Sequence, residues 1–446
     1  MLLLLFLIAL YLAFRRHHKG QLDLQVWIRS QLDIAEFKHA GDTTLEDRLR
    51  LRAVENRRLT AAFGIDNSLT TDSPATHRRF LNTASHILNR NDRSWKDLYY
   101  LAGALISARI SAAAQEQQSR RHPHAGGAAN NNGRRCRVPL AELVRCVVLG
   151  VVLEDSFGLN ARLIPWTYLA TITREINEQW LRSKREPKAV TRSEVLDLTI
   201  RKLGPIPWSA VLPSSLTGVS RNGVGGGGYD RGEEDRPLTP EEILGLLMPQ
   251  YETLWRVVLL TFVTAFHHQP QAVPDAKRRI TDVPDCLGHR ELEEEALKLA
   301  KEGLRLYPSN KHLYRSSNIT TIPPHPAPRT LSTDLLTLHT HPQIWGRDSL
   351  QFRPSRFDSL TDLQRAAYIP FSLGPHRCPA GAGAGRGRRF GERMVLMLVA
   401  ALGRGLDAEQ GSVDFGAAGW EMVWRRRGRL PMGRGEVEGW GFEVWG

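Results

Sequence analysis

The chain has 446 residues, a formal net charge of +13 and four cysteines, Cys136, Cys146, Cys286 and Cys378. The basic residues are scattered or lie in glycine-rich tracts without a recognition motif, which argues against a nucleic-acid-binding protein. The cysteine spacings are typical neither of a disulfide framework nor of a structural zinc site, and they suit a reducing compartment. A chain of this length leaves room for one large helical domain built around a cofactor.

The N-terminus carries an apolar run, residues 2–14, that is followed at once by basic residues at 15–19. As a helix this run would rise about 20 Å, which is short of the roughly 30 Å hydrocarbon core but sufficient for a thinned bilayer. In a cleaved signal peptide the basic residues would precede the apolar run, whereas here they follow it. By the positive-inside rule this order keeps the bulk of the chain in the cytoplasm. We therefore expect residues 1–19 to form an N-terminal membrane anchor.

From residue 21 to residue 114 the apolar residues recur at intervals of three and four, which predicts helices. A further apolar helix is expected at residues 140–153. Three tracts rich in glycine, asparagine or arginine cannot bury a face, and we expect flexible insertions there. They are residues 122–135, 220–236 and 381–387.

A long helix begins at a clear start signal. Thr239 can cap the helix, Pro240 fits its first position, and Glu242 completes a capping box. The apolar pattern then continues to Phe266. Charged residues interrupt that pattern, so a membrane span is not expected.

Pro249 lies inside this helix, and the pair Glu252 and Thr253 follows it directly. Proline has no N–H to donate to the Gly245 carbonyl, so one hydrogen bond is lost and a kink is expected. From the residues alone, Glu252 is interpreted as a surface charge and Thr253 as a core residue.

An amphipathic helix is predicted at residues 290–306, with acidic residues early and basic residues late, as the helix dipole favours. Within it, Glu302 and Arg305 lie three residues apart and share a face. Such a pair is ordinarily exposed and contributes a few tenths of a kcal/mol, about 0.2–0.5.

The segment from Pro370 to Ala380 reads PFSLGPHRCPA and contains few residues able to build a helix or strand. Its one cysteine, Cys378, follows a turn at Gly374 and the basic residue His376. A thiolate needs positive charge and backbone N–H donors nearby, and this loop can supply both. The alternative is a purely structural role, in which Cys378 is a small buried hydrophobic residue.

This loop resembles the haem-binding loop of the cytochrome P-450 monooxygenases, F-x-x-G-x-(R/H)-x-C-x-(G/A). The residues that match are Phe371, Gly374, His376, Cys378 and Ala380. The resemblance implies a mainly α fold with a small β part, the cytochrome P-450 fold, in which residues 20–446 form a haem-thiolate catalytic domain. It implies that Cys378 is the axial ligand of the haem iron, with Phe371, Gly374 and His376 contributing to the haem site. Phe390 follows Cys378 by twelve residues, further than in the family, and the intervening tract is expected to loosen the N–H donors around the thiolate.

The long helix is similar to the family helix that crosses the oxygen-binding face of haem, and the resemblance implies that Glu252 and Thr253 deliver protons there. The family has a small residue and a glycine before this pair, where the chain has Pro249 and Gln250. This departure puts the proton relay in doubt.

Residues 302–308 closely resemble the family's E-x-x-R helix, and residues 352–357 match the loop that provides a second arginine. The resemblance implies a buried structural triad of Glu302, Arg305 and Arg356. It also makes Arg315 and Arg78 contacts of the haem propionates, although Pro74 stands where a tryptophan is expected before Arg78.

The resemblance as a whole implies a monooxygenase that inserts one oxygen atom of O2 into an apolar small molecule, as fungal members do in secondary metabolism. Haem b would be the cofactor, and electrons would come from NADPH through a membrane-bound NADPH-cytochrome P-450 reductase. The protein would lie at the endoplasmic reticulum membrane with its catalytic domain facing the cytoplasm, and without a nucleic-acid partner. Two alternatives stay open, namely a haem-thiolate isomerase or dehydratase that needs no reductase, and a non-catalytic relic of the fold.

Overall fold

The structure of the protein is a computed structural model. It describes residues 23–38, 43–89, 94–121, 135–211, 236–272, 283–287, 289–317, 329–381, 389–407, 410–416 and 429–445. The expected anchor at residues 1–19 and most of the three expected insertions lie outside these residues. Arg135, at the end of the first insertion, begins a strand instead.

The described part of the chain is mainly helical. Its α-helices are α2 (Leu45–Phe63), α3 (Pro74–Asn89), α4 (Trp95–Arg121), α5 (Leu140–Phe157), α6 (Trp166–Arg185), α7 (Glu194–Arg201), α10 (Pro240–Val263), α12 (Val283–Cys286), α13 (Arg290–Leu306), α14 (Leu335–Thr340), α15 (Pro342–Trp345), α16 (Asp362–Ala367), α17 (Phe390–Gly405) and α19 (Arg434–Val437), and residues 23–35 are also helical. Shorter turns are η2 (Ala161–Leu163), η3 (Trp208–Ala210), the π-helix η4 (Thr264–His268), η5 (Pro270–Ala272), η6 (Pro354–Asp358), η7 (Gly374–His376) and η8 (Pro379–Gly381).

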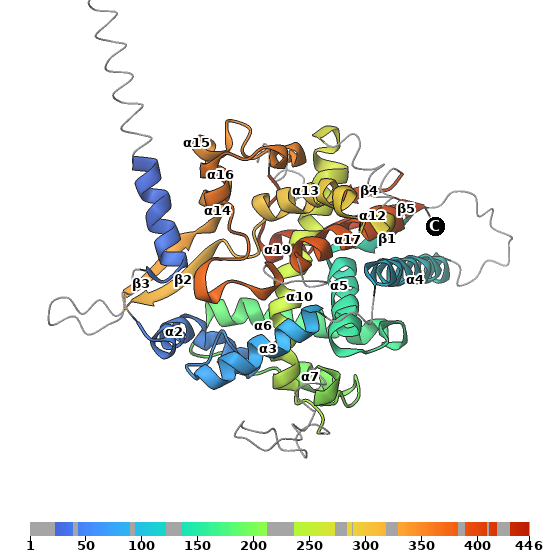
Figure 1. The fold of residues 1–446 in the computed structure, drawn as a ribbon. Helices are drawn as coiled ribbons and strands as arrows, with labels where there is room; N and C mark the ends of the chain where they lie inside the picture. Colours follow the sequence, from blue (N-terminus) through green and yellow to red (C-terminus); the bar gives the residue numbers. More distant parts are fainter. Residues whose placement is uncertain are drawn as a thin grey trace, which may run out of the picture.

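Two small antiparallel sheets accompany these helices and lie on opposite sides of the molecule in Figure 1. The first has the order β1-β5-β4, from Arg135–Pro139, Gly441–Trp445 and Ser412–Asp414. The second pairs β2 (His312–Ser317) with β3 (Arg329–Asp334), with Arg315 opposite Leu331. The predicted mainly α fold with a small β part is confirmed.

The core is built around α10, which crosses the middle of the molecule in contact with α5, α13 and α17 (Figure 1). Most residues of α5, α10 and α17 are buried, and α5 is buried along almost its whole length. A helix that is hydrophobic all round is stable in water only when other helices cover it. The central position of α10 follows from this pattern.

The start of α10 confirms the predicted signal. Thr239 caps the helix in a capping box with Glu242, and Pro240 occupies the first turn. Pro249 lies inside the helix, as the sequence indicates. Pro249 has no N–H to donate to the Gly245 carbonyl. That carbonyl accepts a hydrogen bond of 2.7 Å from the Asn67 side-chain amide. A side chain, rather than a water, therefore satisfies the freed carbonyl.

Among the described residues, no helix combines the length and the apolar character needed to cross a membrane. The apolar run at residues 2–14 lies outside them.

Candidate functional site

The loop around Cys378 is held in a defined shape by its own backbone and by a neighbouring segment. The Cys378 N–H donates a hydrogen bond of 2.8 Å to the Phe371 carbonyl. Gly374 has φ +67°, and a Cβ placed there would come within 3.2 Å of the Glu36 Cα atom. Since other residues rarely adopt this backbone conformation and the neighbour is main chain, glycine is required at position 374.

Phe371 fastens this loop to the start of α17. A Cβ on Gly381 would lie 2.5 Å from the Phe371 ring, and a Cβ on Gly391 would lie 2.6 Å from the same ring. The ring therefore packs directly against two glycine backbones, one on each side of residues 382–388. Gly381 and Gly391, which flank this tract, therefore both lie against Phe371, although Cys378 and Phe390 are separated by additional residues.

Protein surrounds the Cys378 thiol without covering it. The Cys378 side chain is accessible to solvent. Burial of its surroundings raises the thiol pKa, and this effect is opposed by the Ala380 N–H and by the positive charges of Arg52 and Arg377. The positive charges and the backbone N–H donor that the sequence predicts near the thiol are therefore both present. Binding of a metal ion to such a thiol would favour the deprotonated form outright.

A cluster of basic side chains lies beside this loop, formed by Arg52, His77, Arg315 and His376, and we call it the cationic cluster. The Arg52 Nη1 atom is 3.4 Å from His376 Nδ1, and the His77 and His376 rings are 5.8 Å apart. The Arg315 guanidinium group lies 4.6 Å from the centre of the Phe37 ring. Arg315, His77 and His376 are each about 5% exposed.

The cationic cluster has no carboxylate partner among the described residues. Burial lowers the pKa of Arg52 to about 10 and that of Arg315 to about 9, and no carboxylate raises either value; only Cys378 opposes the shift of Arg52. Burial and the surrounding positive charges lower the pKa of His376 to about 2, so this ring is neutral at pH 7. Arg315 Nε and His376 Nε2 are buried without a hydrogen-bond partner. Unpaired buried cations are costly, and an anion bound among them would relieve that cost.

Sequence reasoning identified two of these four residues. His376 lies in the loop motif and Arg315 on the strand between two motifs, whereas Arg52 is brought to the loop by α2 and nothing in its sequence context marks it. His77 lies on α3 next to the predicted Arg78 but was not itself predicted. Arg78 was expected at this position but is exposed. Its neighbour His77 is buried in the cluster instead, because successive residues of a helix point in directions about 100° apart.

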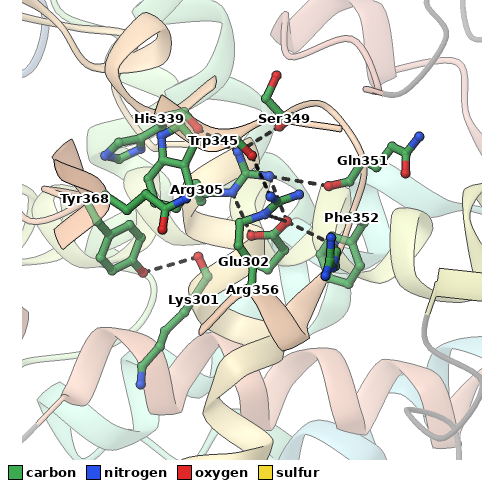
Figure 2. A network of polar contacts seen from close by, with 12 residues as sticks. Lys301, Glu302, Arg305, His339, Trp345, Ser349, Gln351, Phe352, Arg356 and Tyr368 are labelled. Atoms are coloured by element: carbon green, nitrogen blue, oxygen red, sulfur yellow. Dashed lines mark hydrogen bonds and ion pairs between the residues drawn. The ribbon is translucent and has the colours of Figure 1, made fainter. Parts of the chain in front are cut away.

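Glu302 and Arg305 form a fully buried pair, not the exposed pair that the sequence also allowed. Both side chains have no solvent exposure, and two bonds of 2.7 Å join the guanidinium group to the carboxylate. Glu302 also accepts the Arg353 N–H at 2.9 Å, and Arg356 Nε lies 3.5 Å from it. Figure 2 shows these groups converging on the carboxylate.

Backbone carbonyls accept hydrogen bonds from both arginines, and the Asp348 carboxylate also pairs with Arg356. Arg305 Nη1 donates to the carbonyls of His339 and Ser349 at 2.7 and 2.8 Å, and Arg356 Nη1 donates to that of Trp345 at 2.7 Å (Figure 2). The network therefore ties α13 to the chain between α14 and η6. That chain in turn leads to the Cys378 loop, because Ile369 donates its N–H to the His339 ring at 3.1 Å.

Glu252 and Thr253 are both engaged by protein groups. Glu252 is 3% exposed and forms an ion pair with the Arg434 guanidinium group. The Thr253 hydroxyl donates a hydrogen bond of 2.9 Å to the Pro249 carbonyl. The structure thus excludes Glu252 as a surface charge.

The fold and the site together define a class of protein. A mainly helical domain with a central helix, an accessible cysteine on a glycine-turn loop and a cationic cluster beside it is typical of a haem-thiolate protein. Residues 298–402 match the family described as cytochrome P-450, and this stretch includes the buried triad and Cys378. This stretch of the chain is therefore similar to the cytochrome P-450 family, and two of the similar proteins described below carry the same family name.

Similar proteins cover parts of the chain. Two Caenorhabditis elegans proteins named as cytochromes P-450 are 28% identical over 165 residues and 26% identical over 163 residues, each match spanning 32% of this chain. The chain spans about 30% of the length of these relatives. A benzoate 4-monooxygenase of Aspergillus niger is 40% identical over 70 residues, which are 15% of this chain and 12% of that protein.

The family implies a haem cofactor with O2, and the residues of the site fit one. Cys378 would provide the thiolate ligand, and Arg52 and Arg315 would bind the anionic side groups of the porphyrin. The unpaired Arg315 Nε and His376 Nε2 atoms are the observation that supports this fit. When bound, haem supplies the redox chemistry, which no amino-acid side chain of the site can provide.

We predict that Arg315→Met increases the stability of the apoprotein against unfolding and lowers its affinity for haem. Removing one cation from a buried cluster that contains no anion relieves repulsion and desolvation in the empty protein. The same change removes a charge-assisted contact with an anionic ligand, which is worth roughly tenfold or more in affinity. Urea unfolding of the apoprotein and spectroscopic haem titration measure the two effects separately.

Arg137→Met is the matched control, because Arg137 also lies on a strand but is 47% exposed and pairs with Asp414. Arg137→Met should change neither the stability of the apoprotein nor its affinity for haem appreciably. A less stable Arg315→Met apoprotein with unchanged haem affinity would contradict an anion-binding role for the cluster.

Proposed function

We propose that this protein is a haem-thiolate monooxygenase that inserts one oxygen atom of O2 into a small organic substrate. The observation that supports this most strongly is the pairing of an accessible Cys378 thiol with buried cations that have no carboxylate partner among the described residues. A thiolate ligand and anion-binding arginines are the two attachments that an iron porphyrin with propionates requires.

In this proposal haem b is bound by Cys378, Arg52, Arg315 and His376. Electrons come from NADPH through a membrane-bound reductase, and residues 1–19 anchor the chain at the endoplasmic reticulum with its catalytic domain in the cytoplasm. The apolar length of α10 supports a substrate with a large apolar part. The fungal benzoate 4-monooxygenase among the similar proteins supports small-molecule oxidation, in keeping with a role in fungal secondary metabolism.

The experiment that tests this proposal is the difference spectrum of the purified, dithionite-reduced protein with and without carbon monoxide. A thiolate-ligated haem gives a Soret maximum at distinctly longer wavelength than a haem ligated by histidine. We expect the thiolate-type spectrum. A protein that binds no haem would support the non-catalytic relic, and a histidine-type spectrum from freshly prepared protein would reject Cys378 as the ligand.

A reductase-independent isomerase or dehydratase is the second candidate function, and the geometry near Glu252 favours it. The Asn67 side chain donates a hydrogen bond to the Gly245 carbonyl that Pro249 leaves without its helical donor. The Thr253 hydroxyl donates to the Pro249 carbonyl, and Glu252 forms an ion pair with Arg434. An isomerase or dehydratase of this kind needs no relay of protons to O2, so these engaged groups would not impair it.

We predict that Thr253→Ala separates the two candidates. In a monooxygenase that uses this hydroxyl for proton delivery, the change should lower product formation roughly 10²-fold and divert NADPH consumption to peroxide. Haem content should not change. Product and peroxide are measured per NADPH consumed, with Thr253→Ser as the control that restores the hydroxyl. Full coupling in the alanine variant would remove Thr253 from the mechanism, and turnover without NADPH would establish the isomerase.

A further inference from the structure

A second group of charged side chains surrounds Glu252, on the side of α10 that faces α2, α6 and α19. It consists of Arg58, Lys184, Glu252, Arg256 and Arg434, and we call it the Glu252 cluster. It extends from Lys184, which is exposed, through the partly buried Arg58 and Arg256 to the buried Glu252 and Arg434. The cluster is therefore reachable from the surface.

Trp180 of α6 organises the cations of the cluster. The Arg58 and Arg434 guanidinium groups lie 4.5 and 4.7 Å from the centre of its ring, and the Lys184 ammonium group lies 5.7 Å from it. Arg434 also donates a hydrogen bond of 3.2 Å to the Asn177 side chain. Aromatic faces attract cations, so one tryptophan holds three positive groups at one place.

The charges of the cluster do not balance. Four cations face one carboxylate, that of Glu252. Glu438, which accepts a bond of 2.8 Å from Asn177, is already paired with Arg145. An uncompensated positive charge within a protein is unfavourable, and it creates a strong positive potential for a diffusing anion.

The pKa shifts of the cluster reflect this imbalance. Burial and the charge of Arg434 lower the pKa of Arg256 to about 10. Burial and the charges of Arg58, Arg434 and Arg256 lower that of Lys184 to about 8, with Glu252 opposing. Arg256 and Lys184 therefore remain mostly protonated at pH 7.

An unpaired hydroxyl group lies within electrostatic range of the same groups. Tyr251 has no solvent exposure, and its hydroxyl has no hydrogen-bond partner. Burial and the adjacent Glu252 carboxylate raise its pKa well above the usual value, with Arg145 and Arg434 opposing. A buried phenol of this kind is a hydrogen-bond donor without an acceptor.

We propose that the Glu252 cluster binds the carboxylate group of the substrate, so that the substrate class is an organic monocarboxylate. This inference rests on the proposed function for the assignment of the ligand as substrate. Arginine forks match the planar carboxylate group.

The test compares octanoate with octanamide, which has the same chain and no charge, by isothermal titration calorimetry on the haem-loaded full chain. We expect octanoate to bind at least tenfold more tightly. Arg58→Met should lower the affinity for octanoate roughly tenfold and leave that for octanamide unchanged. Arg57→Met is the matched control, because Arg57 is the preceding residue of α2 and is exposed. Octanoate should also bind more weakly at pH 9 than at pH 7, since Lys184 then loses its charge.

Arg58 is preferred to Arg434 for this test because loss of Arg434 would leave Glu252 buried without its partner. Equal affinities for octanoate and octanamide, or equal effects of Arg58→Met and Arg57→Met, would overturn the proposal. So would inorganic phosphate that displaces octanoate at equal concentration. The carbon monoxide spectrum of the same preparations distinguishes the two levels of inference. Carboxylate binding without a thiolate-type spectrum would reject the monooxygenase while leaving the anion site in place.

Discussion

Replacement of Cys378 by alanine is expected to abolish the thiolate-type carbon monoxide spectrum and all oxidation. No other cysteine can substitute for it, since Cys136 and Cys146 are buried and Cys286 lies on α12, away from the loop. Thiolate sulfur is a soft, strongly donating ligand, and alanine has no atom that could replace it. The expected effect is complete, because the ligand is removed and not merely displaced.

The Cys378→Ala protein should nevertheless fold. The loop is held by the Cys378 N–H to Phe371 bond and by the packing of Phe371 on two glycines, and neither involves the thiol. Circular dichroism should therefore match that of the wild type while the spectrum at the Soret band changes. Cys286→Ala is the control that removes a cysteine and keeps the spectrum. A Cys378→Ala protein that retains the thiolate-type spectrum would refute the assignment of the ligand.

Replacement of Glu302 by alanine is expected to have the largest effect on folding. The carboxylate is fully buried and serves Arg305, the Arg353 N–H and Arg356. Its removal leaves the Arg305 guanidinium group buried without a counter-charge, and breaking such a pair costs about 3–5 kcal/mol. That loss is comparable with the whole stability of many domains, so little soluble, haem-loaded protein should be recovered.

Glu295→Ala is the matched control for this experiment. Glu295 lies on the same helix and pairs with Lys298 at the same spacing of three residues, but its side chain is 44% exposed. Exposed pairs of this kind contribute about 0.2–1 kcal/mol. The yield of soluble protein and the urea midpoint of each variant give the comparison. If the two substitutions cost the same, Glu302 would have no structural role beyond that of a surface pair.

The sequence by itself determined the features that depend on near neighbours in the chain. The capping box at Thr239, the position of Pro249 inside a helix and the helix at residues 290–306 are confirmed, because caps, proline and amphipathic periodicity act within a few residues. The turn at Gly374 belongs to the same kind, whereas the close approach of the Glu36 main chain to it is tertiary.

Only the tertiary structure decided which distant charges meet. Arg52 and His77 join the Cys378 loop, Asn67 binds the Gly245 carbonyl, and Arg434 pairs with Glu252 from a distant part of the sequence. None of these partners lies in a motif, and the propensity of an arginine for a helix is the same whether it ends at the surface or beside a buried cysteine. Burial is set by which helices pack together. The imbalance of charge that marks both the cationic cluster and the Glu252 cluster therefore exists only in the folded chain, where water no longer screens it.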